Sequence, residues 1–182
     1  FGKHKSSIPL DRFWDRASNV AKVAMFIGKK LNKKMPLEDL YTAALFQDCG
    51  IPAMAVKYPD YDKVMEQAEH DYQRTVTEIE AMNYPSNHAV VGYFIASTWH
   101  LPRPICQLVL RHHEREYLDT FNDDDSQLMF AVIKMAENIV NNLHQFRELA
   151  DWQTLKTPIF EVLDCDDDTY DDLYEDIEQH VL

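Results

Sequence analysis

Apolar residues recur every three or four positions along almost the whole chain, and the alternation typical of strands is scarce. Residues 11–34 show the pattern most clearly, because their apolar side chains fall on one stripe and lysines gather at the end, where the helix dipole favours cations. Such a stripe is stable only when it is buried against other helices. The sequence therefore predicts an all-α fold, a compact multi-helix bundle.

The second expected helix carries the first polar pair of interest. It begins after Pro36 and is expected to stop at Gly50 and Pro52, which places Gln47 and Asp48 on its last turn. Further helices are predicted from the same periodicity over 63–82 (one or two helices), 88–99, 105–114, 123–146 and 169–181. Ser86 is the expected N-cap of the helix that starts at His88.

The net charge of the 182 residues is −13, which argues against nucleic acid or an anionic membrane as the main partner. Residues 160–182 hold ten of the 31 acidic residues and no Lys or Arg, so the remainder carries 18 basic against 21 acidic residues, or −3. We expect the acidic C-terminal extension, about 151–182, to be a solvated helix surface, and a docking surface for a basic partner is the alternative.

Three cysteines lie far apart, at Cys49, Cys106 and Cys165, and they form no CxxC pair. This pattern favours neither a disulfide framework nor a zinc knuckle and fits a reducing cytoplasm. No apolar run approaches the roughly 20 residues of a membrane span.

The helical hairpin formed by 88–99 and 105–114 gives the most informative geometry. If the chain reverses near Leu101, antiparallel packing brings His88 close to His112 and His113. Neutral imidazole is a common ligand for transition metals, so the three rings suggest a metal site. The alternative is that these histidines bond exposed backbone groups at helix ends or face water.

Two acidic residues are candidates to complete such a site, Asp48 and Glu137, although either one can instead be solvated or paired with a basic side chain. The sequence contains no GxSxG, P-loop, GxGxxG or HExxH pattern, so nucleophilic hydrolase, nucleotide-cradle and zincin mechanisms have no local support.

The motifs "FWDRAS", "AALFQDCG", "NHAVVGYFIASTWHLP", "LRHHE" and "KMAENIV" occur in this order on expected helices. Together they resemble the HD superfamily of metal-dependent phosphohydrolases, and "FW", "WHLP" and "HHE" are most similar to the HD-related output domain, HDOD. The resemblance runs from about Leu10 to Val140. It implies one domain over 1–182 with its core at about 10–150. The helical segment that usually precedes "FW" in this family is not present in this chain, which implies either that the chain is a fragment of a longer protein or that the segment is replaced.

The resemblance also implies that ligands of the active enzymes have been lost. Arg16 stands where those enzymes have a histidine, and Gln47 stands in place of the histidine of the His-Asp dyad, which keeps Asp48. An amide oxygen is a weak ligand for a transition metal, and a guanidinium cannot ligate. The implied vestigial HD pocket comprises Arg16, Gln47, Asp48, His88, His112, His113 and Glu137. We expect Arg16 to pair with Asp48 or Glu137 where a metal would otherwise sit.

The resulting expectation is a non-catalytic, cytoplasmic signal-output domain of bacterial type that binds a protein partner or a neighbouring signalling domain and needs no cofactor. One alternative is a metal-dependent phosphohydrolase, with a divalent ion held by Asp48, His88, His112, His113 and Glu137. Another alternative is an anion or nucleotide sensor that uses Arg16 and the histidines, since a guanidinium grips phosphate bidentately.

Overall fold

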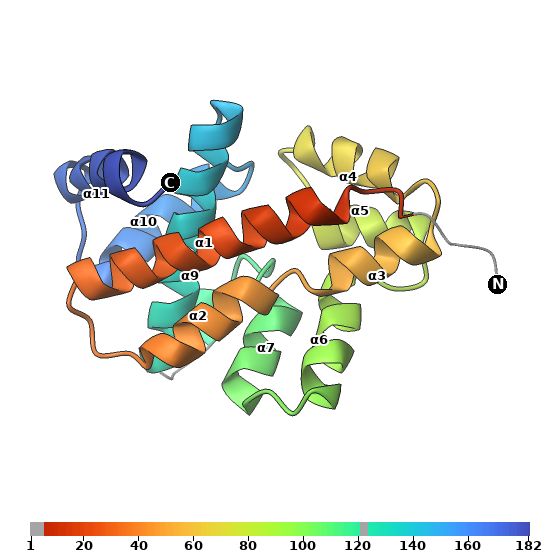
Figure 1. Cartoon of the computed structure of the whole chain (residues 1–182), viewed down its shortest axis with the longest axis horizontal. Coiled ribbons are helices and arrows are strands. Elements are labelled where there is room, and N and C mark those ends of the chain that lie inside the picture. The colour runs from red at the N-terminus through yellow and green to blue at the C-terminus, as the bar shows by residue number, and fades with distance from the viewer. Residues whose placement is uncertain (1–5, 121–123) are drawn as a thin grey trace. The chain divides into compact units, whose positions relative to one another are not determined.

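A computed structural model describes residues 6–120 and 124–182, and its regular elements over those ranges are all helices (Figure 1). The all-α prediction is confirmed. The helices are α1 Leu10–Lys30, α2 Leu37–Phe46, α3 Gly50–Lys57, α4 Tyr61–Glu69, α5 Val76–Asn83, α6 His88–Thr98, α7 Arg103–Arg111, α8 Tyr117–Thr120, α9 Asp124–Gln145, α10 Trp152–Leu163 and α11 Asp167–His180. None of those described is long and apolar enough to cross a membrane.

The chain divides into two units. The first contains the described residues up to Ala17 together with Phe46–Glu114, and the second contains Ser18–Leu45 with the described part of Arg115–Leu182. Each unit buries its own apolar side chains. In the first, Ile51, Met54, Tyr61, Ile79 and Tyr84 belong to one hydrophobic cluster.

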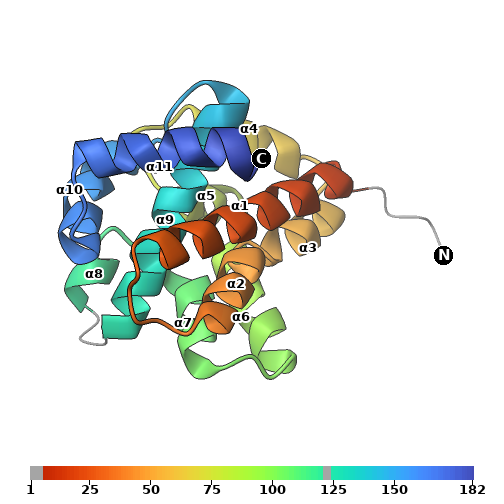
Figure 2. The same ribbon diagram turned by 60° about the vertical axis from the view of Figure 1, so that its left-hand side comes forward.

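The first unit is organised around α6, which packs against α3 and α7. Both views show α6 and α7 side by side as a hairpin (Figures 1 and 2), as their spacing in the sequence predicts. Two glycines permit this packing. A Cβ at Gly50 would lie 1.9 Å from the carbonyl oxygen of His88, and a Cβ at Gly92 would lie 2.9 Å from Cγ1 of Val109. The start of α3 therefore lies directly on the first turn of α6.

The prediction that Gly50 and Pro52 end a helix is wrong. Helix α2 ends at Phe46, residues 47–49 form a turn, and Gly50 begins α3. Pro52 is tolerated there because the first turn of a helix needs no backbone N–H donor. Gln47 and Asp48 therefore lie in a turn between two helices and not on the last turn of one.

Other boundaries also differ from the sequence prediction. The N-cap of α6 is Asn87, not Ser86, and its side chain accepts a hydrogen bond from the Val90 amide at 2.9 Å. The segment 63–82 forms two helices, α4 and α5. Helix α9 matches the predicted long helix from Asp124 onward, and position 123 lies outside the described residues.

The C-terminal segment 151–182 contributes to the core of the second unit. Helix α10, which was not predicted from the sequence, packs on α9 and buries Trp152, Leu155 and Ile159. The buried Asn138 of α9 donates to the Tyr170 hydroxyl at 3.0 Å and accepts from the Leu149 amide at 2.9 Å. The acidic residues of α11 lie mainly on its exposed side, and Asp176 pairs with Lys30 at 2.8 Å.

Gly50→Ala should lower the free energy of unfolding by at least about 3 kcal/mol, because a methyl group would collide with backbone atoms that cannot move independently. Gly28→Ala is the matched control. Its Cβ would approach only side-chain ends, with Leu40 Cδ2 nearest at 2.9 Å, and alanine favours a helix interior, so the net change should stay within about 1 kcal/mol. Urea denaturation of both variants measures the difference, and equal losses would contradict the assigned role of Gly50.

Candidate functional site

Four side chains of the first unit converge on one point. Asp48 comes from the turn before α3, His88 begins α6, and His112 and His113 follow directly after α7. Each offers one ligand atom, and these atoms all lie within 4.8 Å of one another. The expectation that the hairpin brings His88 to the His-His pair agrees with this geometry. We refer to these four residues as the Asp48–histidine cluster.

The contacts within the cluster are close. Nε2 of His88 lies 3.0 Å from Nε2 of His113. Oδ1 of Asp48 lies 3.1 Å from Nε2 of His112 and 3.4 Å from Nε2 of His88. Two imidazole lone pairs at 3.0 Å repel each other unless a proton or a cation lies between them. A proton on one of the two Nε2 atoms, or a cation bound by both, accounts for this distance.

In two of the histidines, Nδ1 forms a hydrogen bond with an acceptor outside the cluster. Nδ1 of His112 lies 2.8 Å from the carbonyl oxygen of Val109, and Nδ1 of His88 lies 2.7 Å from Oε2 of Glu80. Both acceptors require a proton on Nδ1, so Nε2 is the ring atom that faces the cluster in each case. Glu80, on α5, is fully buried.

Glu80 has further partners that fix its position. Its Oε2 accepts from the His88 backbone amide at 3.2 Å, and its other carboxylate oxygen accepts from the hydroxyl of the buried Tyr61. Neither Glu80 nor Tyr61 was predicted from the sequence as a site residue. Neither belongs to a motif, and a lone glutamate on a short helix usually faces solvent, so no local pattern could have identified it.

The partners shift the pKa values of Asp48 and His88. Burial would raise the pKa of Asp48, but hydrogen bonds with His112 and His88, and the charge of both rings, hold it well below its usual range. Burial would likewise lower the pKa of His88, but hydrogen bonds with Asp48 and Glu80 and their negative charge raise it to about 9. His88 is therefore positively charged near neutral pH when no metal is bound.

Arg16 and Gln47 lie in the same unit as the cluster. Nη1 of Arg16 is 3.9 Å from Oδ2 of Asp48, and the Arg16 side chain is 39% exposed, so this ion pair is loose and partly screened. Gln47 is buried, and its Oε1 has no hydrogen-bond partner among the described residues.

Glu137, the remaining residue of the implied pocket, belongs to the second unit. It is buried on α9, and its carboxylate pairs with Nζ of Lys134 at 3.0 Å on the same helix. Asp151 lies 3.7 Å from the same Lys134 nitrogen. Glu137 therefore has a counterion within its own unit.

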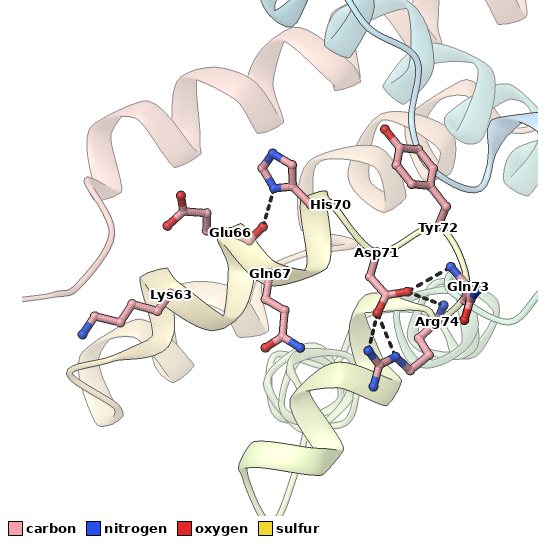
Figure 3. Close-up of a pocket in the computed structure, with 8 residues that line it drawn as sticks. All are labelled: Lys63, Glu66, Gln67, His70, Asp71, Tyr72, Gln73 and Arg74. Carbon is pink, nitrogen blue, oxygen red and sulfur yellow. Dashed lines mark hydrogen bonds and ion pairs between the residues drawn. The ribbon is translucent and has the colours of Figure 1, made fainter.

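The hollows that the structure describes lie away from the cluster. One of about 670 Å³ is formed by α4 and the connection to α5, where Asp71 pairs with Arg74 (Figure 3). Another, of about 520 Å³, is lined by residues of α10 and the start of α11. No residue of the Asp48–histidine cluster lines either hollow. Three residues of the cluster are buried, and His113 is half-buried.

Comparison with known proteins identifies the fold. The sequence profile of the HDOD domain matches residues 1–115. The chain belongs to the HDOD family. A search of curated proteins finds no match.

Two solved structures are similar to this HDOD chain. The crystal structure of an HDOD domain protein with unknown function from Geobacter sulfurreducens has a TM-score of 0.72 at 18% identity, covering 98% of this chain and 61% of that one. A protein from Shewanella amazonensis SB2B, named "putative phosphohydrolase", has a TM-score of 0.66 at 15% identity, covering 96% of this chain and 61% of that one. At these identities the likeness shows the fold, and the chain spans about three fifths of either structure.

The stability of the metal-free protein should depend on the charge of His88. Because its pKa in the folded state, about 9, lies above the usual 6.5, the stabilisation is full below about pH 6.5 and is lost as the pH rises through about 9. The loss should reach at most about 3 kcal/mol. Denaturation in the presence of a chelator measures it, and His88→Gln should show a flatter pH profile over the same range. Equal slopes in the two proteins would contradict the charge assigned to His88.

Proposed function

We propose that this HDOD chain is a non-catalytic regulatory domain that evolved from a metal-dependent phosphohydrolase and acts by binding a protein partner or a neighbouring signalling domain. The observation that carries the proposal is the place of Arg16, whose guanidinium lies 3.9 Å from Asp48. A hydrolase of this class needs an ion beside that carboxylate to hold phosphate and generate hydroxide. A permanent cation near Asp48 lowers the affinity of the site for a metal ion, by an amount that solvent screening reduces.

The charges around the cluster can balance without an ion. Asp48 and Glu80 are buried carboxylates, and a protonated His88 contacts both. Arg16 supplies a second positive charge near Asp48. Buried carboxylates are costly without counterions, so this arrangement removes the need for a metal to stabilise the fold.

The number of protein ligands in the cluster also differs from that of a catalytic zinc site. Structural sites are closed by four protein ligands, whereas catalytic sites keep a position open for water or substrate. Asp48, His88, His112 and His113 supply four donors within 4.8 Å of one another. An ion restricted to these four ligands would have no open position for a phosphate ester, whereas an ion that takes six ligands would keep two.

A metal-dependent phosphohydrolase is the second candidate. The convergence of three imidazoles and a carboxylate favours it, and one similar structure is named as a phosphohydrolase. In that case Asp48, His88, His112 and His113 would hold the ion, which polarises phosphoryl oxygens and lowers the pKa of bound water. An anion sensor has weaker support because the guanidinium of Arg16 lies beside Asp48.

The proposed regulatory role is expected to be cytoplasmic, and the wide spacing of the three cysteines, with no CxxC pair, supports this expectation. The partner is expected to be a protein and not a nucleic acid or a membrane, since the net charge is −13. The exposed acidic side of α11 is available to a basic partner or simply to solvent.

The purified chain should not hydrolyse phosphomonoesters or cyclic phosphodiesters when Mn²⁺, Ni²⁺ or Fe²⁺ is added. A chromogenic nitrophenyl ester and a cyclic dinucleotide are suitable substrates, and Asp48→Ala identifies contaminating activity because it removes the one carboxylate of the cluster. Metal-dependent turnover that Asp48→Ala abolishes would refute the non-catalytic role and support the second candidate.

Replacing Arg16 and Gln47 by histidine should raise the affinity of the chain for Co²⁺ by at least about tenfold, since a neutral ligand replaces a repelling cation. Competition with a chelator measures the affinity. Arg12→His is the matched control, because Arg12 lies exposed on the same helix. Equal affinities in the double variant and the wild type would show that Arg16 does not oppose metal binding.

A further inference from the structure

We infer that Glu80, fixed by Tyr61, is a positioning residue that aims Nε2 of His88 into the Asp48–histidine cluster and thereby sets the affinity of the cluster for a divalent transition metal ion. This goes beyond the proposed regulatory function, which requires no ion, and it does not depend on whether the cluster turns over a substrate.

Acceptors behind the rings orient two of the histidines. Histidines that bind a metal almost always donate their other ring N–H to a carboxylate or a backbone carbonyl. His88 meets this condition through Glu80 at 2.7 Å, and His112 meets it through the carbonyl of Val109 at 2.8 Å. Two rings from different helices are thus held in the orientation that a metal ligand requires.

Glu80 is itself rigidly held. Both of its carboxylate oxygens are occupied, one by the ring and the backbone amide of His88 and the other by the Tyr61 hydroxyl. Glu80 and Tyr61 are completely buried, so water cannot replace these partners. Breaking the hydrogen bond between Glu80 and Nδ1 of His88 would leave a buried carboxylate with one donor fewer, which is energetically costly.

The charge of Glu80 adds to its effect on the ring. A buried carboxylate behind the imidazole makes the ring a stronger electron donor at Nε2. Nε2 of His88 lies close to two other members of the cluster, 3.0 Å from Nε2 of His113 and 3.4 Å from Oδ1 of Asp48. Glu80 consequently acts on the cluster through His88, without contacting the ion.

Glu80→Gln tests the inference because it keeps the length of the side chain and removes its charge. The affinity of the full chain for Co²⁺, measured by competition with a chelator, should fall by about 10- to 100-fold. Tyr61→Phe should also weaken binding, but by less.

Tyr84→Phe is the control, since Tyr84 belongs to the same hydrophobic cluster but its hydroxyl donates to Asp60 at 3.2 Å. The Co²⁺ affinity of the Tyr84→Phe variant should stay within about twofold of the wild type.

A second measurement separates positioning from simple loss of stability. In protein labelled with ¹⁵N-histidine, the Nδ1 proton of His88 should give a resonance protected from exchange with water, which His88→Gln identifies by its absence. Glu80→Gln should move or broaden that resonance, whereas Tyr84→Phe should leave it in place.

Three results would overturn the inference: wild-type protein that binds no Co²⁺, a Glu80→Gln variant that binds as tightly as the wild type, or a Tyr84→Phe variant that loses as much affinity as Tyr61→Phe. Co²⁺ binding that depends on Glu80 but brings no hydrolysis leaves both proposals standing. Turnover of a phosphate ester would overturn the proposed function alone.

Discussion

The contact between the start of α3 and the first turn of α6 is the constraint on which the site depends. The absence of a side chain at Gly50 lets the two backbones meet, since a Cβ there would lie 1.9 Å from the His88 carbonyl oxygen. That contact places the preceding turn, and therefore Asp48, beside the His88 ring. Gly92 has the same role further along α6, where it admits Val109 of α7 and so brings the end of α7 to the same place. The cluster is a consequence of two close helix crossings.

Charge is the second constraint, because Asp48 and Glu80 are both buried. Two carboxylates in a protein interior require positive partners. His88 contacts both of them, and Arg16 approaches Asp48 from α1. The arrangement keeps these polar residues in the interior, because basic side chains lie close to the buried carboxylates.

The hairpin was predictable because its geometry follows from spacing. Once the reversal is placed near Leu101, the antiparallel arrangement of α6 and α7 dictates that His88 meets His112 and His113. The helix α3 was not predictable, because glycine and proline usually end helices and only the packing against α6 explains why they begin one here. Helix α10 was not predicted for a related reason. It contains Pro158, and proline usually interrupts a helix. Its apolar residues Trp152, Leu155 and Ile159 are buried by packing in the second unit.

The sequence by itself determined the all-helical class and the approach of His88 to the histidine pair, because helical periodicity and hairpin spacing are local properties. The family followed from the resemblance of its motifs. Only the tertiary structure decided that Glu80 and Tyr61 lie behind His88 and that Arg16 lies 3.9 Å from Asp48. The physical reason is that a polar side chain is buried only when partners from distant segments satisfy it. Those partners are brought together by packing, which no short stretch of the chain encodes.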